Sequence, residues 1–501
     1  MSRKDIGFCC SGQTNVLSWS YLTIFHCVLS AKVYKVHKNK GIMQRSSWTR
    51  PTAKTMRDML HIGAPIFAEL FLVSLFVMVD TALLKPCGTT AIAAVGLTAE
   101  PINVLEFLFF AVQTAVIARM ARASAKNDRS AIHAIIRGYL KLTLASAVLL
   151  AVLTGAFAVP FLTLFGGTAD TLPIAVPYFQ ISLLAFVCRR MYGAMATILK
   201  GLDKPQWSFL LNLIANGINI VGDVVLINGY GPFPKLGALG AAVATVSGCA
   251  VGLLCAVVVM RDQLRAREIR IPLSDWLRST WRETRAICTE ALPMAGEKVM
   301  IRLGIFLSIT RIAALGTTAF AAYRILISLQ NFAYLGAEAV ATTALIFLSK
   351  AYANHGRKAA QDAFSAALVY GLAFSSLCAV LFFTVPSFLM SCYSDDPQVL
   401  TEGVRVLRII FLYQPFQAVA LIYASGMRSC RHAGIPSIII TVGIVLVRPS
   451  LVYLLAGPLG VCGAWIAIMT DEIVRCVLLF ALRGKMWRQF TDAPTPSTAV
   501  V

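Results

Sequence analysis

The chain has 501 residues, of which 57% are hydrophobic and only 14% are charged, and its formal net charge is +21. This composition excludes an ordinary soluble enzyme, because apolar runs of about 20 residues, the length that crosses a bilayer, recur along the whole sequence. The runs are continuous rather than short and alternating, which excludes a membrane β-barrel, so we expect an all-α polytopic membrane protein.

Beyond residues 1–56, the apolar runs predict twelve transmembrane helices in two lobes of six. The N-lobe, 57–262, holds helices near 61–84, 91–118, 138–160, 176–198, 207–228 and 237–260. A charged cytoplasmic linker, 263–286, follows. The C-lobe, 287–484, holds helices near 287–312, 319–348, 361–386, 403–427, 435–456 and 461–482. Residues 485–501 are predicted to be a cytoplasmic tail.

Residues 1–56 do not share the pattern of the remaining chain. Their one apolar piece, 16–31, is short for a membrane span. Two interpretations stay open: an N-terminal cytoplasmic segment with a signal-like or interfacial piece, or an upstream extension with Met43 as the natural start.

Lysine and arginine gather in alternate gaps between the predicted helices. The gaps 119–137, 199–206 and 261–286 are rich in both, whereas the intervening gaps contain only Lys85 and Lys235 as cations. Because cytoplasmic loops carry the excess of Lys and Arg, we expect a multi-pass protein of the cell (plasma) membrane with both termini in the cytoplasm. The positive charge thus indicates topology, and no nucleic-acid partner is expected.

The two halves contain an internal repeat. The piece CGTTAIAAV (87–95) recurs as LGTTAFAAY (315–323), a shift of 228 positions, and LGALGAAVA (236–244) recurs as LGVCGAWIA (459–467), a shift of 223. With an even number of helices in each half, the two lobes have the same orientation, so the repeat is parallel. Such repeats place a substrate cavity between the lobes, and rocking of the lobes gives alternating access.

The helix predicted near 207–228 carries a polar stripe. Four of its residues, spaced four, three and four apart, fall within about 60° of one another around a helix. They are Asn212, Asn216, Asn219 and Asp223. Because polar groups are costly in lipid, the stripe must face protein or water. Two interpretations stay open: hydrogen bonds that hold the lobe together, and a functional site.

Asp80 is the single carboxylate in the apolar stretch FLVSLFVMVDTALL (71–84). Burial favours the protonated form of a carboxyl group, and a second carboxylate nearby favours it further. We therefore hypothesise that Asp80 and Asp223 bind and release the coupling ion, H⁺ or Na⁺, with three polar partners. These partners are Asn216, Asn219 and Thr245. The alternative for Asp80 is a structural cap at the end of a helix.

The helix predicted near 319–348 carries Arg324, Asn331 and Glu338 on one face, each seven residues from the next. Glu338, with Glu106 of the second helix, would give a substrate cavity that attracts cations. Pairing of Glu338 with a cation of a neighbouring helix is an equally weighted alternative; the candidates are Arg324, Arg302 and Lys298. The predicted cavity residues are Asn103, Gln113, Asn212, Asn331 and Glu338.

Residues typical of catalysis or metal binding form no motif in this sequence. The thirteen cysteines are scattered, the histidines show no metal spacing, and G-x-x-x-x-G-K-[ST] does not occur. We expect a protein that is not an enzyme and is a monomer in the lipid bilayer. Its partner would be a small-molecule substrate, and it would need no metal and no cofactor beyond the coupling ion.

Several stretches resemble the multidrug and toxic compound extrusion (MATE) family, and together they run in order over about 57–488. They are MVDTALLKPCGTTAIAAVGL (78–97), LKGLDKPQWSFLLNLIANGINIVGDVVLINGYG (199–231), LGTTAFAAYRI (315–325), RSCRHAGIPSIIITVGIVLVRPSLVYLL (428–455) and GVCGAWIAIMTDEIVRCVLLFALRGKMW (460–487). The resemblance implies a twelve-helix, two-lobe exporter that exchanges H⁺ or Na⁺ for organic, often cationic compounds.

The resemblance also assigns roles to single residues. Asp80 matches the acid of the family's V-D-T motif, and Asn219 with Asp223 matches its N-x-x-x-D, the pair linked to ion coupling in the DinF-like branch. Glu338 falls where the family often has an acid in helix eight. Arg448 falls on an R-x-P-like motif.

The chain departs from the family in three places. V-D-T is followed by LLKPCG, and AAYR puts Arg324 where a neutral Gln is usual. The helix near 403–427 has no acid, although another branch uses one there for sodium. Arg324 speaks against a purely cationic substrate range, so a flippase or exporter of lipid-linked or anionic substrates in the same superfamily is the alternative function.

Overall fold

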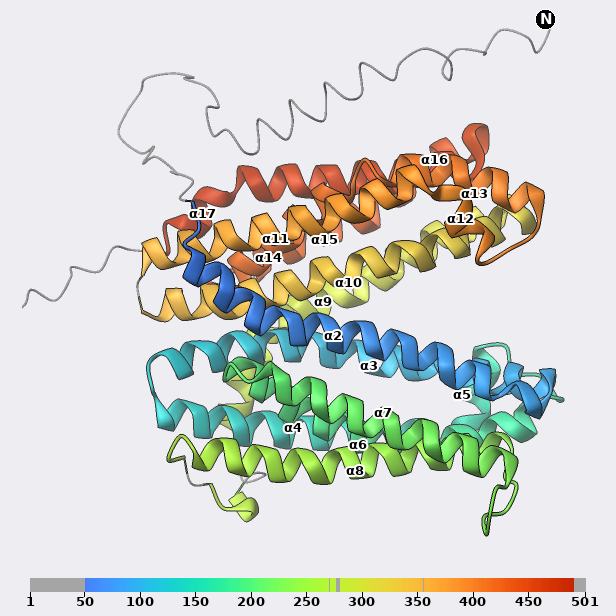
Figure 1. Cartoon of the computed structure of the whole chain (residues 1–501), viewed down its shortest axis with the longest axis horizontal. Helices are drawn as coiled ribbons and strands as arrows, with labels where there is room; N and C mark the ends of the chain where they lie inside the picture. The colour runs from blue at the N-terminus through green and yellow to red at the C-terminus, as the bar shows by residue number, and fades with distance from the viewer. Residues whose placement is uncertain (1–49, 270, 276–279, 355, 491–501) are drawn as a thin grey trace, which may run out of the picture. The chain divides into compact units, whose positions relative to one another are not determined.

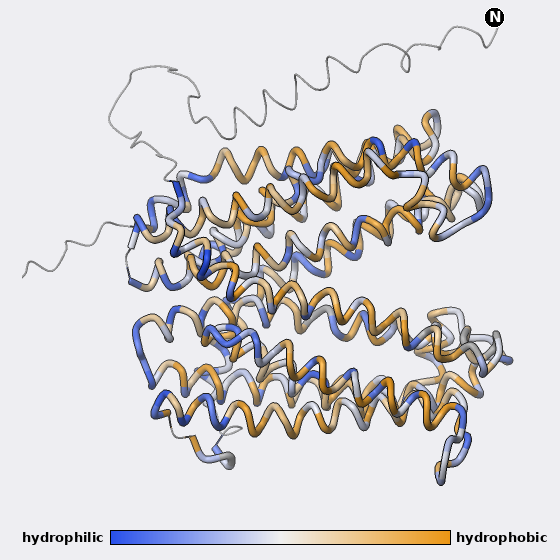
Figure 2. Tube along the Cα trace, in the orientation of Figure 1, coloured by the Kyte–Doolittle hydropathy of each residue, from blue (hydrophilic) through white to orange (hydrophobic). Residues whose placement is uncertain are grey.

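Long helices make up nearly all of the chain that the computed structural model describes, which is residues 50–269, 271–275, 280–354 and 356–490. The predictions for 1–49 and for 491–501 concern segments outside these residues. Figure 2 shows hydrophobic residues along most of the length of the helices.

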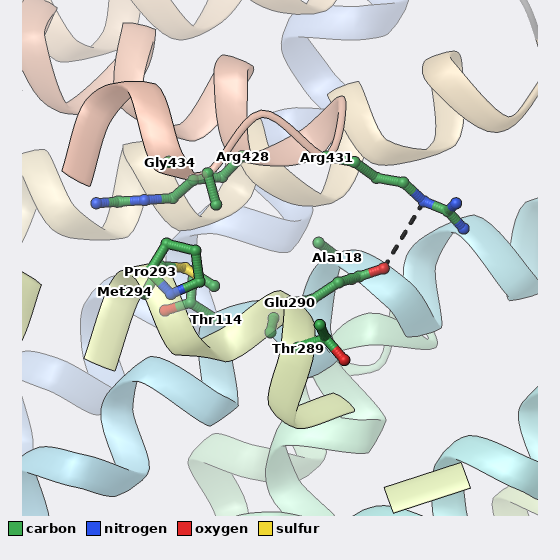
Figure 3. A pocket seen from close by; sticks show the side chains of 11 residues that line it. Thr114, Ala118, Thr289, Glu290, Pro293, Met294, Arg428, Arg431 and Gly434 are labelled. Atoms are coloured by element: carbon green, nitrogen blue, oxygen red, sulfur yellow. Dashed lines mark ion pairs between the residues drawn. The ribbon is translucent and has the colours of Figure 1, made fainter. Parts of the chain in front are cut away.

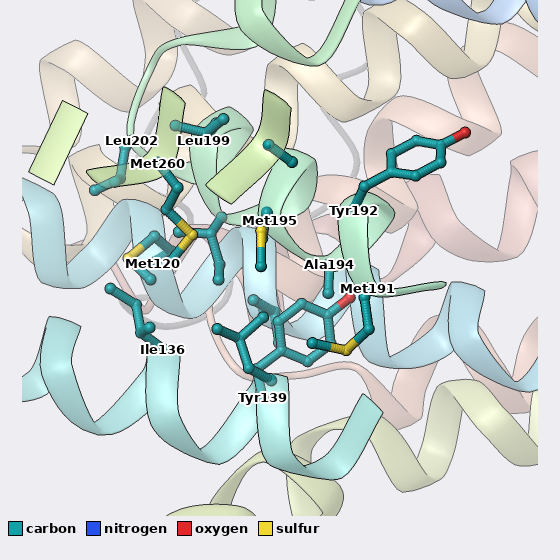
Figure 4. Packing of buried hydrophobic residues seen from close by; sticks show 14 of the residues in the cluster. Met120, Ile136, Tyr139, Met191, Tyr192, Ala194, Met195, Leu199, Leu202 and Met260 are labelled. Carbon is teal, nitrogen blue, oxygen red and sulfur yellow. The ribbon is translucent and has the colours of Figure 1, made fainter. Parts of the chain in front are cut away.

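The N-lobe consists of six long helices and two short ones (Figure 1). They are α2 (Ala53–Leu83), η1 (Lys85–Cys87), α3 (Thr89–Ala125), α4 (Arg129–Ala156), α5 (Ala158–Leu164), α6 (Leu172–Gly201), α7 (Pro205–Asn228) and α8 (Ala238–Arg265). Their core includes Met120 of α3, Tyr139 of α4, Met195 of α6 and Met260 of α8, all buried (Figure 4).

The short helix η2 (Leu273–Asp275) lies in the linker, and the C-lobe follows. Its elements are α9 (Trp281–Ala313), α10 (Thr317–Ala353), α11 (Arg357–Thr384), α12 (Pro386–Ser391), α13 (Pro397–Ile410), α14 (Gln414–Ser429), α15 (Gly434–Val442), the π-helical turn η3 (Gly443–Val447), α16 (Arg448–Ala481) and α17 (Arg483–Trp487). Trp465 and Tyr413 lie in its core without measurable exposure.

The twelve predicted spans are confirmed, although three have irregular shapes. Among the described residues, nine helices are long and apolar enough to cross a membrane, and α13 with α14 forms a further span bent by 52°. The segment Gly434–Ala481 holds two spans, because the chain turns back at Gly460 (Figure 1). The remaining span is α9, whose charged first turns lower its mean hydropathy.

The backbone repeats in the same way as the sequence. Three pairs of residues, related by the sequence shifts of 228 or 223, share positive φ angles. They are Gly88 and Gly316 (85° and 107°), Gly237 and Gly460 (58° and 59°), and Asp203 and Arg431 (63° and 64°). Because positive φ is uncommon outside glycine, the match of Asp203 with Arg431 is a specific mark of the repeat. The predicted parallel repeat is therefore confirmed.

Candidate functional site

The helix ends that carry Asp80 and Asp223 lie together. One turn beyond these acids, Leu84 and Ile227 belong to the same buried cluster, which joins the end of α2 to the end of α7. This shared cluster places the last turn of α2, which carries Asp80, beside the last turns of α7, which carry Asp223. The structure therefore brings together the helix ends of the two acids that the sequence pairs, here termed the acid pair.

Each acid of this pair has one oxygen without a hydrogen-bond partner. The Oδ1 atoms of Asp80 and Asp223 are buried and unpartnered among the described residues, and Asp223 as a whole is 2% exposed. An unpartnered buried oxygen is costly while the carboxyl is ionised, so the pair is suited to hold a proton or a cation. Asp80 lies in the last turn of α2, where a carboxylate opposes the helix dipole and cannot cap the free carbonyls.

Two of the predicted polar partners lie beside Asp223. The Nδ2 of Asn219, one turn earlier on α7, donates to Oγ1 of Thr245 on α8 at 3.2 Å. Helices α7 and α8 approach closely here because Gly248 has no side chain: a Cβ would lie 2.3 Å from the Ala215 carbonyl oxygen. Asn216 donates instead to the Asn212 carbonyl oxygen of its own helix, at 2.8 Å.

A buried acid that the sequence reasoning missed, Glu69, lies at the other end of the polar stripe. It accepts hydrogen bonds from Nζ of Lys200 at 2.9 Å, from Oγ of Ser208 at 2.8 Å and from Nδ2 of Asn212 at 3.0 Å. Asn212, predicted to line the substrate cavity, is thus bonded inside the N-lobe, and its place in a cavity stays a prediction. A signal for Glu69 was available, since it lies three turns before Asp80 in equally apolar sequence.

The C-lobe contains the same arrangement at repeat-related positions. Glu297, 228 positions after Glu69, accepts from Nη2 of Arg428 at 2.8 and 2.9 Å and from Oγ of Ser437 at 2.6 Å. Arg428 is 228 positions after Lys200. Each lobe therefore holds a triad of an acid, a cation and a serine. Their acids have the donors that an ionised carboxylate needs, unlike the acid pair.

Another acid of the N-lobe is also paired within that lobe. Glu106, grouped from the sequence with the cavity residues, pairs with Arg189 at 3.0 Å and with Arg190 at 3.3 Å. The charge of Glu106 is thus paired with α6, and its place in a substrate cavity stays a prediction.

The C-lobe has a neutral cluster of four charges at the π-helical turn. Nη2 of Arg448 lies 2.8 Å from Asp471, Nη2 of Arg475 lies 3.0 Å from Asp471, and both arginines also pair with Glu472. Gly443 makes room for the cluster, since a Cβ there would lie 2.2 Å from Oδ1 of Asp471. In the C-lobe, the position equivalent to Asp80 is Ser308, so the acid pair has no copy there.

The other predicted cavity residues lie on α3 and α10, which pack against each other across the two lobes. Asn103 and Asn331, a repeat-related pair, are exposed, and Gln113 is partly buried. Glu338 is also partly buried and accepts a hydrogen bond from the Tyr334 hydroxyl at 3.1 Å. A shared substrate cavity for these residues stays a prediction.

Polar contacts between the lobes gather at the ends of the helices that carry the Lys- and Arg-rich gaps, here termed the basic end. The first helix of each lobe binds the other lobe there. Thr52, the N-cap of α2, donates to Asp362 of α11 from its N–H and its hydroxyl, both at 2.8 Å. Glu283 in the first turn of α9 accepts from Arg137 of α4 at 2.7 Å.

The second helix of each lobe also reaches across at the basic end. Arg122 of α3 bonds to Glu290 of α9 at 2.8 Å, and Lys350 of α10, 228 positions later, pairs with Asp203 after α6. Any rocking that separates the lobes at the basic end must break these contacts. They therefore hold this end closed in the structure described.

Reversing the charge of Lys350 is expected to weaken this closure. In Lys350→Asp, the ion pair with Asp203 is replaced by a repulsion, so the ratio of closed to open molecules should fall about fivefold. The measurement is the distance distribution between spin labels at Lys126 and Lys358, which are exposed on different lobes. The double variant Lys350→Asp with Asp203→Lys restores attraction and should restore the wild-type distribution; a double variant that stays open would contradict the gate role.

Comparisons with known proteins agree with this architecture. The MatE family model matches residues 65–225 and 293–454, one segment in each lobe. A probable multidrug resistance protein NorM of Thermotoga maritima is 23% identical over 436 residues, which cover 86% of this chain and 92% of that protein. An FAD transporter of Shewanella oneidensis is 24% identical, over 82% of this chain and 88% of that protein.

Solved structures share the fold. The MATE transporter VcmN of Vibrio cholerae, in its bent form, matches with a TM-score of 0.79 at 17% identity and covers 87% of this chain and 98% of that one. A MOP superfamily transporter from Pyrococcus furiosus, described as having a binding pocket of reverse polarity, matches with a TM-score of 0.76 at 16% identity, over 86% and 95% of the two chains.

Proposed function

We propose, from the premise that this chain belongs to the MatE family of membrane transporters, that it exports organic, often cationic compounds in exchange for protons. The observation that carries the proposal is the acid pair, whose buried Oδ1 atoms have no partner among the described residues. The matching segments V-D-T at Asp80 and N-x-x-x-D at Asn219 and Asp223 support a place in the DinF-like branch.

The contrast with the triads supports a titrating role for the acid pair. Glu69 and Glu297 each accept several hydrogen bonds, including at least one from a cation, so both carboxyl groups have their donors within their own lobe. Two carboxylates at adjoining helix ends would repel each other while both are ionised, so the acid pair would be stabilised when one of them takes up a proton or a cation. Loading and unloading of this site would then bias the two lobes between their closed and open arrangements at the basic end.

The orientation follows from the distribution of charge. The basic end would face the cytoplasm of a plasma membrane, and the acid pair, at the opposite helix ends, would face the outside. In the structure described, the basic end is held closed by contacts between the lobes. Protons arriving from outside would therefore reach the acid pair while the route to the cytoplasm is shut, which is the order that alternating access requires.

Proteoliposomes that contain the purified chain test this function. An imposed pH gradient should drive a fluorescent organic cation across the membrane, and dissipating that gradient with a protonophore should stop the movement. A sodium gradient imposed at equal pH on both sides distinguishes the coupling ion. Dye movement that follows sodium alone would overturn the proton assignment.

Glu338→Gln is expected to change substrate affinity rather than coupling. Removing one negative charge from a cavity that attracts cations should raise the half-saturating concentration of a cationic substrate by about fivefold, as for one partly solvated ion pair. Initial rates over a range of substrate concentrations, for one cationic and one neutral substrate, provide the measurement. Equal losses for both substrates would indicate a structural role, such as support of Tyr334.

Arg324 favours a second candidate, the export or flipping of lipid-linked or anionic compounds. Its side chain is exposed on α10, on the face that also carries Asn331. An anionic substrate would find a partner there, whereas an organic cation would be repelled. Translocation of a labelled anionic lipid headgroup, together with no proton-linked movement of cationic dye, would favour this function over the first.

A further inference from the structure

A cavity of about 310 Å³ lies at the basic end, where the two lobes meet (Figure 3). Its walls come from α3 of the N-lobe and, in the C-lobe, from α9, the end of α14, the turn 430–433 and the start of α15. Thr114, Thr289 and Glu290 supply polar groups to the lining, and Arg428 and Arg431 supply positive charge. None of these residues belongs to the acid pair.

The surroundings of this cavity between the lobes, here termed the seam cavity, are strongly positive. Three arginines surround one carboxylate: Nη1 of Arg119 lies 3.1 Å from Glu290, Nη2 of Arg122 lies 2.8 Å from it, and Nε of Arg431 lies 3.7 Å from it. Arg428 is neutralised by Glu297 of its triad. Two positive charges at the seam are thus left over after Glu290 is counted against the three arginines.

At the basic end the lobes meet at two repeat-related places, here termed seams: one around Arg122 and Glu290, the other around Lys350 and Asp203. The repeat shows that this excess of positive charge belongs to the first seam. At the other seam Lys350, the repeat equivalent of Arg122, pairs with Asp203. The position equivalent to Asp203 is Arg431, which has the same left-handed backbone, with φ of 64° against 63°. An acid that neutralises one seam is therefore replaced by a cation at the other, and the cavity lies where the acid is missing.

Unsatisfied donors point to a ligand that accepts hydrogen bonds. The Nε atom of Arg428, a cavity residue, is buried and has no partner among the described residues, and the same holds for Nε of Arg119. The Arg431 side chain is 63% exposed, so it is free to turn toward a ligand. Guanidinium groups with free N–H atoms bind phosphate and carboxylate oxygens in a bidentate way.

We infer that the seam cavity binds a phosphate group, carried by an anionic phospholipid headgroup or present as free phosphate. Basic pockets between transmembrane helices at the cytoplasmic side are typical sites for anionic headgroups. A phosphate here would lie beside Arg428 and Arg431 of the C-lobe and Thr114 of the N-lobe, with the positive charge of Arg119 nearby at Glu290. Its binding would therefore hold the basic end closed, whichever ion drives transport.

The test is a titration of the purified full-length protein with three separate ligands. They are short-chain phosphatidylglycerol, short-chain phosphatidylcholine and inorganic phosphate. The readouts are the melting temperature and the distance between labels at Lys126 and Lys358. We expect a saturable rise in melting temperature with an anionic ligand, none with phosphatidylcholine, and a shift of the label distances toward the closed form. A response to phosphatidylglycerol alone identifies a lipid headgroup, and an equal response to inorganic phosphate identifies the free anion.

Two variants and a control make the site assignment specific. Arg431→Asp copies the acid that Asp203 provides at the other seam, in the same backbone conformation. It should raise the half-saturating concentration of the anion at least about tenfold. Arg119→Gln, which leaves the turn 430–433 untouched, should raise it as well. Arg129→Gln, an exposed basic-end arginine paired with Glu268, should leave it unchanged. A wild-type protein without a saturable response to either anion, or an undiminished response in both seam variants, would overturn the inference.

Discussion

Replacing Asp80 or Asp223 with asparagine is expected to reduce proton-driven export to the level of protein-free vesicles, while the protein remains folded and inserted. Asparagine keeps the size of the side chain but cannot take up or release a proton, so the cycle loses its link to the gradient. Because the two acids lie at adjoining helix ends and are proposed to act as a unit, the double variant should be no worse than either single one.

The measurement is dye movement in proteoliposomes under an imposed pH gradient, with the melting temperature and the elution profile as measures of folding. Asp395→Asn is a matched control, since Asp395 is an exposed acid in the loop before α13, outside the acid pair. Counterflow of substrate without a gradient separates coupling from binding and should survive in the asparagine variants. If both variants export at the wild-type rate, the coupling site lies elsewhere.

The second large effect is expected on stability and concerns the triads. Glu69→Ala leaves the ammonium group of Lys200, whose side chain is 15% exposed, without its carboxylate partner, which should lower the free energy of unfolding by about 3–5 kcal/mol. Combining Glu69→Leu with Lys200→Met removes both charges and should recover most of the loss, because no unpaired ion is left.

The repeat supplies an internal replicate of this experiment. Glu297→Ala should lower the free energy of unfolding by a similar amount, since it leaves Arg428, whose side chain is 14% exposed, without its carboxylate partner. Thermal unfolding in detergent or lipid provides the measurement for both lobes. A Glu69→Ala protein of wild-type stability that no longer transports would show that Glu69 handles protons and would refute its assignment as a fixed ion.

Most of the fold could be predicted from the sequence, because a continuous apolar run in lipid can satisfy its backbone hydrogen bonds only by forming a helix. The repeat and the pairing of Asp80 with Asp223 were also accessible, since each rests on local spacing or on isolated charges in apolar sequence. The start of α9 at Trp281 rather than 287 could have been found. Thr280 and Glu283 form a capping box, a pattern that is visible in the sequence.

The triads and the seam contacts could not be predicted in the same way. Glu69 meets Lys200 only because the end of α6 returns beside the middle of α2, which depends on the packing of whole helices. The bend between α13 and α14 and the π-helical turn Gly443–Val447 likewise depend on neighbours, since Gly304 of α9 packs against the Ile444 carbonyl, where a Cβ would lie 2.2 Å away. Helical periodicity along one segment does not contain this information.

The reversal at Gly460 has a consequence for how each lobe deforms. In the C-lobe a single residue tethers two neighbouring spans, and a tether of that length permits a relative displacement of only about 3.5 Å. In the N-lobe the corresponding tether, 229–237, is longer but folds back on α7, because the Leu236 N–H donates to the Leu226 carbonyl oxygen at 2.9 Å. The outer tips of α7 and α8 also pack closely, since a Cβ on Gly240 would lie 2.7 Å from that same oxygen. The last pair of spans is therefore tied at its outer tips in both lobes, and each of these pairs is expected to move as a rigid unit when the lobes rock.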